Sequence, residues 1–311
     1  MIPALTQPKY PKAAIGIERD RLTMLSIQRE GRGRFSLKQA ASVDVPTGLI
    51  EPSFLEKNIK NQTEFLYLLE EAATLSGLMK QTRWSVSLPS NTGRSALLTL
   101  ENEPSSRKEL DEILDWKAEH TFGAPAADLR ISMQKISPDR DGKARYFATA
   151  VKLIVIDEFE TAFETMGWEV GLILPRSVSE SNWLFNRNSF GDSLLLSQQT
   201  DGFTALLLRG GEPRVVRSVT CSINEIDDEI FRLLMFYNDR FASTESGLLD
   251  GLLTIGNAFV PEKIREISKD ALGRAVEVYL PADVGMEMPI GNLNFDDVAA
   301  PAGLASLGAA R

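Results

Sequence analysis

The feature that most constrains this chain is an internal repeat of three strands followed by a helix. In the first copy, apolar strand patterns cover residues 12–17, 22–27 and 35–45, and a helical pattern covers residues 64–78. In the second copy, strand patterns cover residues 194–196, 203–208 and 215–219, and a helical pattern covers residues 224–241. A repeat separated by about half the chain predicts two related α/β lobes that arose by duplication.

Turn and capping residues punctuate both copies of the repeat. A charged turn at residues 18–21 makes the first two strands a hairpin, and Gly31 and Gly33 mark the next turn. In the second copy, Gly210 and Gly211 separate the last two strands. Ser222 and Glu225 then form a capping box, which predicts where the second helix begins.

A segment of different character separates the two copies. Strands are expected at residues 84–88, 95–100, 129–136 and 146–155, and helices at residues 107–121 and 157–166. A further strand at 168–174 returns the chain to the first lobe. The order of strand, helix, strand and strand predicts a subdomain inserted into the first lobe at about residues 84–170.

The last part of the chain completes the second lobe. A strand is expected at residues 252–255, a helix at 261–272, a strand at 276–280 and a closing helix at 298–310. We therefore expect a first lobe over residues 1–190 that contains the insert, and a second lobe over residues 191–297. Residues 298–311 are expected to form a C-terminal helix that packs back on the first lobe.

Charge and cysteine content exclude several classes of protein. Acidic residues outnumber basic ones by 43 to 34 without a basic stripe, so the sequence lacks the signature of nucleic-acid binding. Cys221 is the only cysteine, which excludes an intrachain disulfide and fits a reducing compartment. Residues 1–12 lack the apolar core of a signal peptide, and no apolar run has the roughly 18 residues of a membrane span. We expect a cytoplasmic protein that reaches membranes only through partners.

Several segments of the insert resemble one known family. Residues 112–119 contain Trp116 and Glu119 in a Trp-x-x-Glu helix, and the strand at residues 84–89 ends in Leu-Pro. Together with the apolar strand at 146–156 and the Gly-centred return at 166–170, this order is similar to PilM-type proteins of type IV pilus machinery. The likeness extends over roughly residues 12–310. That family belongs to the actin-like ATPase superfamily and is related to the cell-division protein FtsA.

The resemblance implies a fold and a role. The fold is a two-lobed α/β actin-like architecture, a duplicated ribonuclease-H fold with an inserted strand-helix-strand-strand subdomain. The role is that of a cytoplasmic scaffold that binds the N-terminal cytoplasmic tail of a single-span inner-membrane pilus protein of the PilN type. Self-association and contact with the pilus motor ATPases are further implied partners.

The resemblance also locates a nucleotide site whose motifs are altered. Actin-like ATPases use two Asp-x-Gly turns, in which glycine admits backbone amides to phosphate and aspartate organises Mg²⁺ and water. The first Asp and Gly positions correspond to Glu18 and Asp20, and the second triplet corresponds to Ser197-Gln198-Gln199. The Gly-Gly pair on the adenosine side is reduced to Gly256-Asn257. We interpret these turns as vestigial, and we expect no catalytic residue, no ATP hydrolysis and no bound cofactor, with ATP and Mg²⁺ binding a doubtful remnant.

Other catalytic and metal signatures are incomplete. The sequence has no phosphate-binding G-x-x-x-x-G-K-[ST] loop, and Gly31 and Gly33 lack the third glycine of a dinucleotide fingerprint. Asp139 and Asp141 begin like a calcium loop, but Ala150 stands where a bidentate glutamate is required. Since His120 is the only histidine, a metal site with several histidines is excluded.

Two aromatic residues of the insert are candidates for partner binding. Trp116 lies outside the apolar stripe of its helix, which is formed by Leu110, Ile113 and Leu114. It packs either on the neighbouring lobe or in the wall of a peptide groove between the insert and the first lobe, and the same alternatives apply to Phe122.

Two other functions compete with the scaffold role. One is an actin-like ATPase or kinase with an unusual phosphate site. The other is the cytoplasmic half of a type II secretion L-type protein, which shares the lobes but is expected to continue into a transmembrane helix.

Overall fold

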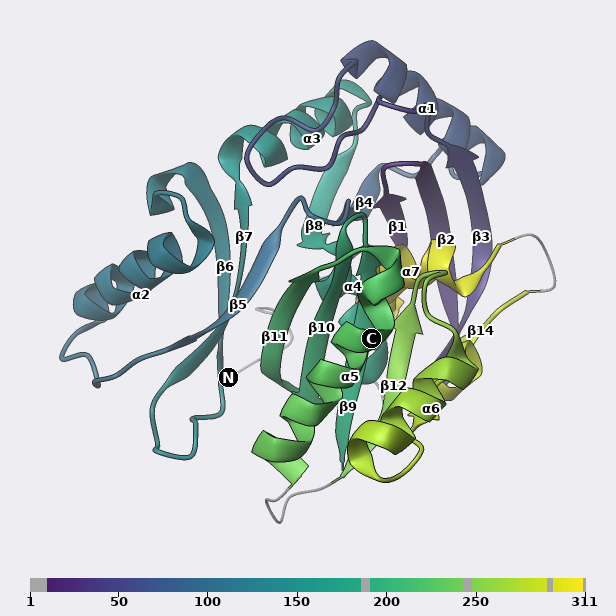
Figure 1. Cartoon of the computed structure of the whole chain (residues 1–311). Coiled ribbons are helices and arrows are strands. Elements are labelled where there is room, and N and C mark those ends of the chain that lie inside the picture. The colour runs from purple at the N-terminus through teal and green to yellow at the C-terminus, as the bar shows by residue number, and fades with distance from the viewer. Residues whose placement is uncertain (1–9, 186–190, 243–247, 290–292, 310–311) are drawn as a thin grey trace.

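Two large β-sheets, one small β-sheet and seven α-helices form the part of the chain that the structure describes, which comprises residues 10–185, 191–242, 248–289 and 293–309 in a computed structural model. The two large sheets lie side by side with helices between and around them, and the small sheet extends to one side (Figure 1). None of these helices is long and apolar enough to cross a membrane.

The first large sheet has the strand order β14-β3-β2-β1-β4-β8. Its strands are β1 (Ala13–Ile17), β2 (Arg21–Gly31), β3 (Arg34–Asp44), β4 (Arg83–Leu88), β8 (Glu169–Pro175) and β14 (Met286–Glu287). The first three strands form an antiparallel meander, and β4 runs parallel to both β1 and β8. Helices α1 (Gln62–Leu75) and α3 (Leu153–Thr165) share a hydrophobic core with this sheet, in which the rings of Phe65 and Phe159 meet edge to face.

The second large sheet repeats this topology. Its order is β11-β10-β9-β12-β13, with β9 (Asp192–Gln199), β10 (Gly202–Arg209), β11 (Glu212–Thr220), β12 (Leu249–Ile255) and β13 (Glu277–Val278). Again three antiparallel strands are followed by parallel additions beside the first of them. Helices α5 (Ile226–Tyr237) and α6 (Pro261–Leu272) share its outer core. The duplication predicted from the sequence repeat is therefore confirmed.

Helices α4 (Arg176–Phe185) and α7 (Phe295–Ala309) lie between the two large sheets. One hydrophobic cluster joins side chains of both helices to side chains of both sheets. The helices approach each other so closely that a Cβ at Gly303 would lie 2.3 Å from the carbonyl oxygen of Ser179. Trp183 locks the pair, because its buried indole Nε1 donates a hydrogen bond to the carbonyl oxygen of Ala299 at 2.7 Å.

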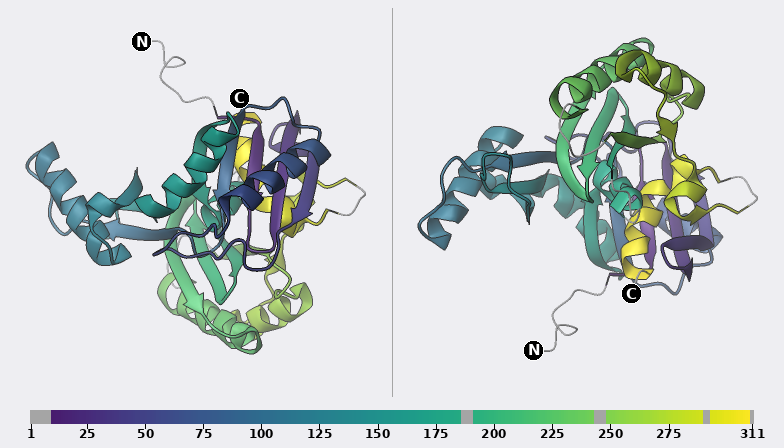
Figure 2. Two further views of the ribbon diagram at one scale, coloured as in Figure 1. Left: turned by 90° about the horizontal axis from the view of Figure 1, so that it is seen from above. Right: turned by 90° about the horizontal axis from the view of Figure 1, so that it is seen from below.

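The insert has a separate small core. It consists of β5 (Arg94–Thr99), α2 (Arg107–Phe122), β6 (Leu129–Ile136) and β7 (Arg145–Lys152), with the strand order β5-β7-β6. Figure 2 shows it extending sideways from the two lobes, with α2 outermost. Both β4 and β8 belong to the first large sheet, so the segment that leaves this sheet lies between them.

The insert contacts both lobes. On the side of the first lobe, the guanidinium of Arg94 stacks over the ring of Phe54 at 4.2 Å. On the side of the second lobe, Arg145 Nη2 donates to the carbonyl oxygen of Pro213 at 3.2 Å. The backbone N–H of Ser137 also donates to the carboxylate of Glu212 at 3.1 Å. The insert therefore bridges the lobes, in addition to packing on the first one.

Most elements agree with the sequence prediction to within a few residues. Helix α6 has the predicted bounds and ends at Gly273, whose φ of +70° is the left-handed conformation that glycine adopts readily. The capping box of Ser222 and Glu225 is present, although a 3-10 turn precedes α5. The closing helix begins at Phe295, three residues before the predicted start at Val298.

Two predictions of local structure are wrong, and one helix was not predicted. Helix α3 begins at Leu153 and not at Asp157, because the apolar run before Asp157 fits a buried helix as well as a strand. The strand expected at residues 276–280 is only the two residues of β13. Helix α4 was not predicted at all, because its buried residues are mainly polar and leave no amphipathic stripe.

We predict that Gly303→Ala destabilises the protein, although the same change stabilises most helices by roughly 1 kcal/mol. The added methyl group would collide with the backbone of α4, and overpacking of this kind typically costs about 1–3 kcal/mol. Chemical denaturation measures the change in the free energy of unfolding. Gly31→Ala is the control, since its new Cβ would meet only the Arg34 side chain at 3.7 Å. Equal stability of the Gly303 variant and the native protein would contradict the close packing of α4 and α7.

Candidate functional site

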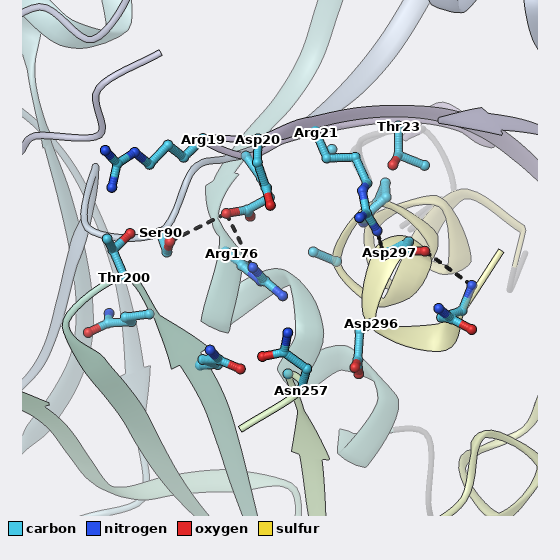
Figure 3. A pocket seen from close by; sticks show the side chains of 18 residues that line it. Arg19, Asp20, Arg21, Thr23, Ser90, Arg176, Thr200, Asn257, Asp296 and Asp297 are labelled. Atoms are coloured by element: carbon cyan, nitrogen blue, oxygen red, sulfur yellow. Dashed lines mark hydrogen bonds and ion pairs between the residues drawn. The ribbon is translucent and has the colours of Figure 1, made fainter. Parts of the chain in front are cut away.

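A cavity of about 410 Å³ lies where the two lobes face each other. Residues from the β1–β2 turn, the end of β9, the segment after β12 and the first residues of α4 and α7 line it (Figure 3). The lining residues are Gly16, Glu18, Arg19, Asp20, Arg21, Thr23, Ser90, Arg176, Gln198, Gln199, Thr200, Gly256, Asn257, Asn294, Asp296, Asp297, Ala300 and Pro301. Five of the six residues that the sequence predicted for the vestigial nucleotide site are among them, and Ser197 is not.

Arg176 is the centre of a buried ionic network at this cavity. The first residue of α4, it places Nη1 at 3.2 Å from Glu18 Oε2 and Nε at 2.6 Å from Glu180 Oε1. Ser90 adds a hydrogen bond, since its hydroxyl donates to Glu18 Oε2 at 3.3 Å. The network ties the β1–β2 turn of the first lobe to the helix that lies between the lobes.

Burial and charge act against each other within this network. Burial raises the pKa of Glu18 and of Glu180 above their ordinary values, although the nearby Arg176 opposes the rise. Burial also disfavours the charge of Arg176, but the two carboxylates outweigh it and raise the pKa of the guanidinium. One guanidinium thus pairs with both the partly buried Glu18 and the fully buried Glu180.

The charges that line the cavity nearly cancel. Four carboxylates and three guanidinium groups line it. Arg21 is paired with Asp297 of α7, as Figure 3 shows, and Arg176 is paired with Glu18 and Glu180. A polyphosphate that enters this cavity would therefore meet at least as many carboxylates as cations. Two of the three cations are already paired with carboxylates of the protein.

The second hairpin turn lies further along the chain than the sequence predicted. Ser197 is inside β9 and only 1% exposed, and the turn between β9 and β10 is formed by Thr200 and Asp201 before Gly202. The turn therefore does contain a carboxylate and is followed by a glycine, contrary to the expectation. Asp201 is not among the residues that line the cavity, and its Oδ1 accepts a hydrogen bond from Asn91 Nδ2 at 2.7 Å.

The two residues predicted for the adenosine side of the site lie beside strand β9. Gly256 and Asn257 follow β12 and line the cavity. Gln198 Oε1 accepts the backbone N–H of Ala258 at 3.0 Å, and Gln199 Nε2 donates to Thr204 Oγ1 at 2.7 Å. The glutamines of the predicted triplet thus make local structural hydrogen bonds within the second lobe.

Metal binding finds little support in these side chains. Within the described ranges, no group of three or more His, Cys, Asp or Glu side chains is placed to hold a metal ion. Glu18 is already engaged with a guanidinium, which supplies positive charge at the first turn without a metal. The arrangement can hold a small polar ligand, and the carboxylates of Asp20 and Asp296 also line it.

Sequence reasoning missed the residue on which this site depends. Arg176 directly follows a strand that ends in Pro175, and no motif distinguishes it from the other arginines. Its partner Glu180 lies four residues later, which is the spacing of an ion pair across one helical turn. That signal was not usable because the helix itself was not predicted.

The structure separates the two aromatic candidates of the insert. Phe122 is 1% exposed in the insert core with Leu114 and Ala118, so it is a core residue and not a groove wall. Trp116 is 55% exposed, so it is not buried against a neighbouring lobe. It lines a hollow of about 370 Å³ on the insert itself, away from the expected groove between the insert and the first lobe.

Comparison with known proteins gives no sequence-level match, since neither a family model nor a curated protein matches the chain. Solved structures match over nearly the whole chain. A chain of the PilM-PilN type IV pilus biogenesis complex has a TM-score of 0.74 at 16% identity, covering 97% of this chain and 99% of that one. A protein of unknown function with an actin-like ATPase fold, from Bacteroides thetaiotaomicron, has a TM-score of 0.51 at 14% identity, with coverage of 96% and 98%.

These matches establish the fold. The chain has the actin-like ATPase fold in the form seen in PilM, so the predicted fold class and the predicted resemblance to PilM are confirmed at the level of structure. The cytoplasmic domain of EpsL, an inner-membrane component of the type II secretion system of Vibrio cholerae, also matches, with a TM-score of 0.48 at 10% identity and coverage of 95% and 93%.

We predict that Arg176→Met destabilises the protein in a pH-dependent way. Loss of the guanidinium raises the pKa of Glu18 and Glu180 further above their already raised values. A carboxyl group with a raised pKa in the folded state stabilises the fold at low pH and loses this contribution as pH rises. The deficit relative to the native protein should therefore grow from about pH 5 to about pH 8, where leaving buried charges unpaired typically costs about 3–5 kcal/mol.

Denaturation at several pH values measures this deficit. Arg83→Met is the control, because Arg83 pairs with Glu169 at the surface, where side chains 58% and 73% exposed make the pair worth about 0–1 kcal/mol. A deficit of the Arg176 variant that stays constant across this pH range would show that the two carboxyl groups do not depend on the guanidinium.

Proposed function

We propose that this chain is a cytoplasmic scaffold of type IV pilus assembly that binds the cytoplasmic tail of an inner-membrane partner of the PilN type. The observation that carries the proposal is the match, over nearly the full length of both chains, to the fold of a PilM-PilN complex. The insert, the two lobes and the helix pair between them all fall within the matched length. In this proposal the protein lies at the membrane only through its partner.

The cleft chemistry supports a scaffold in preference to an ATPase or kinase. A hydrolase of this fold must organise a metal ion and an attacking water between its two turns. Here Arg176 neutralises Glu18 at the first turn, and Asp201 of the second turn is bonded to Asn91. Glu18 and Asp201 therefore make interactions within the protein, whereas Asp20 of the first turn lines the cavity.

The bridging insert adds a mechanical argument. Contacts of the insert with Phe54 and Pro213 hold it on both lobes, and the Arg176 network ties the first lobe to α4. Lobes that are connected in this way present a fixed surface. Since a preorganised surface lowers the entropic cost of binding, such a body suits peptide capture and assembly with further copies or with motor ATPases.

Tail binding is the direct test of the proposal. The full chain is titrated with a synthetic peptide of the cytoplasmic N-terminal residues of a single-span protein of the PilN type, and isothermal calorimetry measures the affinity. We expect saturable one-to-one binding with a Kd on the order of micromolar, equivalent to about 8 kcal/mol. A peptide of the same composition in scrambled order is the control. Absence of binding by the native tail, or equal binding of the scrambled peptide, would refute the proposal.

We further predict that the purified protein hydrolyses no ATP above background, because Glu18 of the first turn pairs with Arg176 and Asp201 of the second turn accepts a hydrogen bond from Asn91. Mg-ATP at millimolar concentration should leave the melting temperature nearly unchanged, since stabilisation follows the ratio of ligand concentration to Kd. A phosphate-release assay and thermal denaturation make the two measurements. Glu18→Ala distinguishes contaminants from true activity: turnover that this variant abolishes would favour the ATPase alternative.

A further inference from the structure

The first large sheet ends in an edge that is only partly covered. Its outermost pairing joins β14 to Phe35 and Ser36, near the start of the 11-residue strand β3. Within the part of the chain that the structure describes, no backbone group pairs with residues 38–44 on the side away from β2. Most of this edge therefore presents backbone donors and acceptors that a further strand can bond.

The direction of the backbone groups identifies those on the open side. The N–H of Val45 donates to the carbonyl oxygen of Asp20 at 2.9 Å, so it faces β2. Pairing of β3 with β2 is regular from residue 39 to residue 44. Because successive residues of a strand turn their backbone groups to opposite sides, Ala40, Ser42 and Asp44 face the open side.

This edge carries little of the protection that sheet edges usually have. Proteins protect open edges with charges, prolines or bulges. Here the charged residues are the exposed Lys38 and Asp44 at the two ends, and residues 39–43 between them are uncharged and contain no proline. Lys38 is the unpaired residue of a bulge, so the regular edge begins after it. Neither charged side chain forms an ion pair with another described residue.

The segment is complementary to itself in an antiparallel arrangement. When Ala41 of one copy lies opposite Ala41 of another, Ala40 comes opposite Ser42, and both of these residues face the other strand. The same register brings Lys38 of each copy beside Asp44 of the other. A slip of two residues in either direction places neither charge opposite its counterpart, so the charges select one register.

The end of α1 adds an apolar element beside this edge. Gln39 Nε2 donates to the carbonyl oxygen of Gly77 at 3.0 Å, which ties the residues after α1 to β3. Figure 1 shows α1 crossing the first sheet toward β3. At this end of the helix, Leu75 and Met79 are 62% and 53% exposed. A two-fold axis perpendicular to the sheet would bring the α1 ends of both copies to the same face, where these side chains can be buried together.

We infer that two copies of this chain pair edge to edge through β3, in an antiparallel, two-fold symmetric dimer centred on Ala41. Main-chain hydrogen bonds join Ala40 to Ser42, ion pairs join Lys38 to Asp44, and the two first sheets become one continuous sheet. The insert stays accessible, because it leaves this sheet between β4 and β8, at the opposite end of the strand order. The inference rests on the assembly with further copies that the proposed function includes, and it gives the surface for that assembly.

Charge reversal tests the register in the full chain. Sedimentation velocity at protein concentrations up to about 100 μM should show a monomer–dimer equilibrium for the native chain. Lys38→Glu should raise the dissociation constant by about tenfold or more, because symmetry places two like-charge pairs across the interface. Asp44→Lys should have the same effect. The combination of both substitutions restores opposite charges and should return the constant to within about threefold of the native value.

Matched controls lie on the second lobe. Lys269→Glu and Asp270→Lys reverse exposed charges on α6 and should leave the dissociation constant within about twofold of the native value. Circular dichroism confirms that each variant is folded.

Cross-linking gives an independent measurement of the register. Residues opposite each other in a non-hydrogen-bonded antiparallel pair have Cα atoms about 4.5 Å apart, which a disulfide can span. Mild oxidation of Ala41→Cys should therefore give a covalent dimer. The native chain, in which Cys221 is the only cysteine, should stay uncross-linked under the same conditions.

The outcomes separate this inference from tail binding. A native chain that stays monomeric at about 100 μM would overturn the dimer, and tail binding by that monomer would leave the scaffold function standing. A dimer that Lys38→Glu does not weaken, or that the combined variant does not restore, would show another surface or register and would also overturn the inference. If the dimer forms as expected but the chain binds no tail, the scaffold function fails and the β3 interface stands.

Discussion

The packing of α4 against α7 is the constraint on which the rest of this structure depends. The two helices fill the space between the large sheets, and their side chains join both lobes in one hydrophobic cluster. Two contacts fix the relative position of these helices. Gly303 lies against the backbone of Ser179, and the buried indole of Trp183 donates a hydrogen bond to the carbonyl oxygen of Ala299. Because α4 begins at the edge of the cavity, this packing also brings Arg176 to the two glutamates.

The chain has the actin-like ATPase fold, and part of the charge in its cleft is satisfied internally. Glu18 of the first turn pairs with Arg176, and Asp201 of the second turn accepts a hydrogen bond from Asn91 of the first lobe. Burial of this ionic network is tolerable because Glu18 and Glu180 both pair with Arg176.

Local sequence signals predicted the elements with amphipathic patterns and clear caps. Helix α6, which begins with a proline and ends before a glycine, has the bounds predicted from the sequence. The predicted α3 is shorter than the observed helix, because an apolar run does not distinguish a buried helix from a strand. At the cavity, Glu18 and Asp20 were located correctly in the β1–β2 turn. The second turn was displaced toward Ser197, because its residues Thr200 and Asp201 do not repeat the spacing of the first.

The sequence by itself determined the duplicated lobes and the position of Trp116 outside the core stripe of its helix, because each of these is a pattern among neighbours along the chain. Only the tertiary structure decided that Phe122 is buried, that α4 exists, and that Arg176 joins Glu18 to Glu180. Each of these features depends on contacts between distant segments or on the burial of polar residues. Such features are set by how the sheets and helices pack together, and no periodicity or motif in the local sequence reveals them.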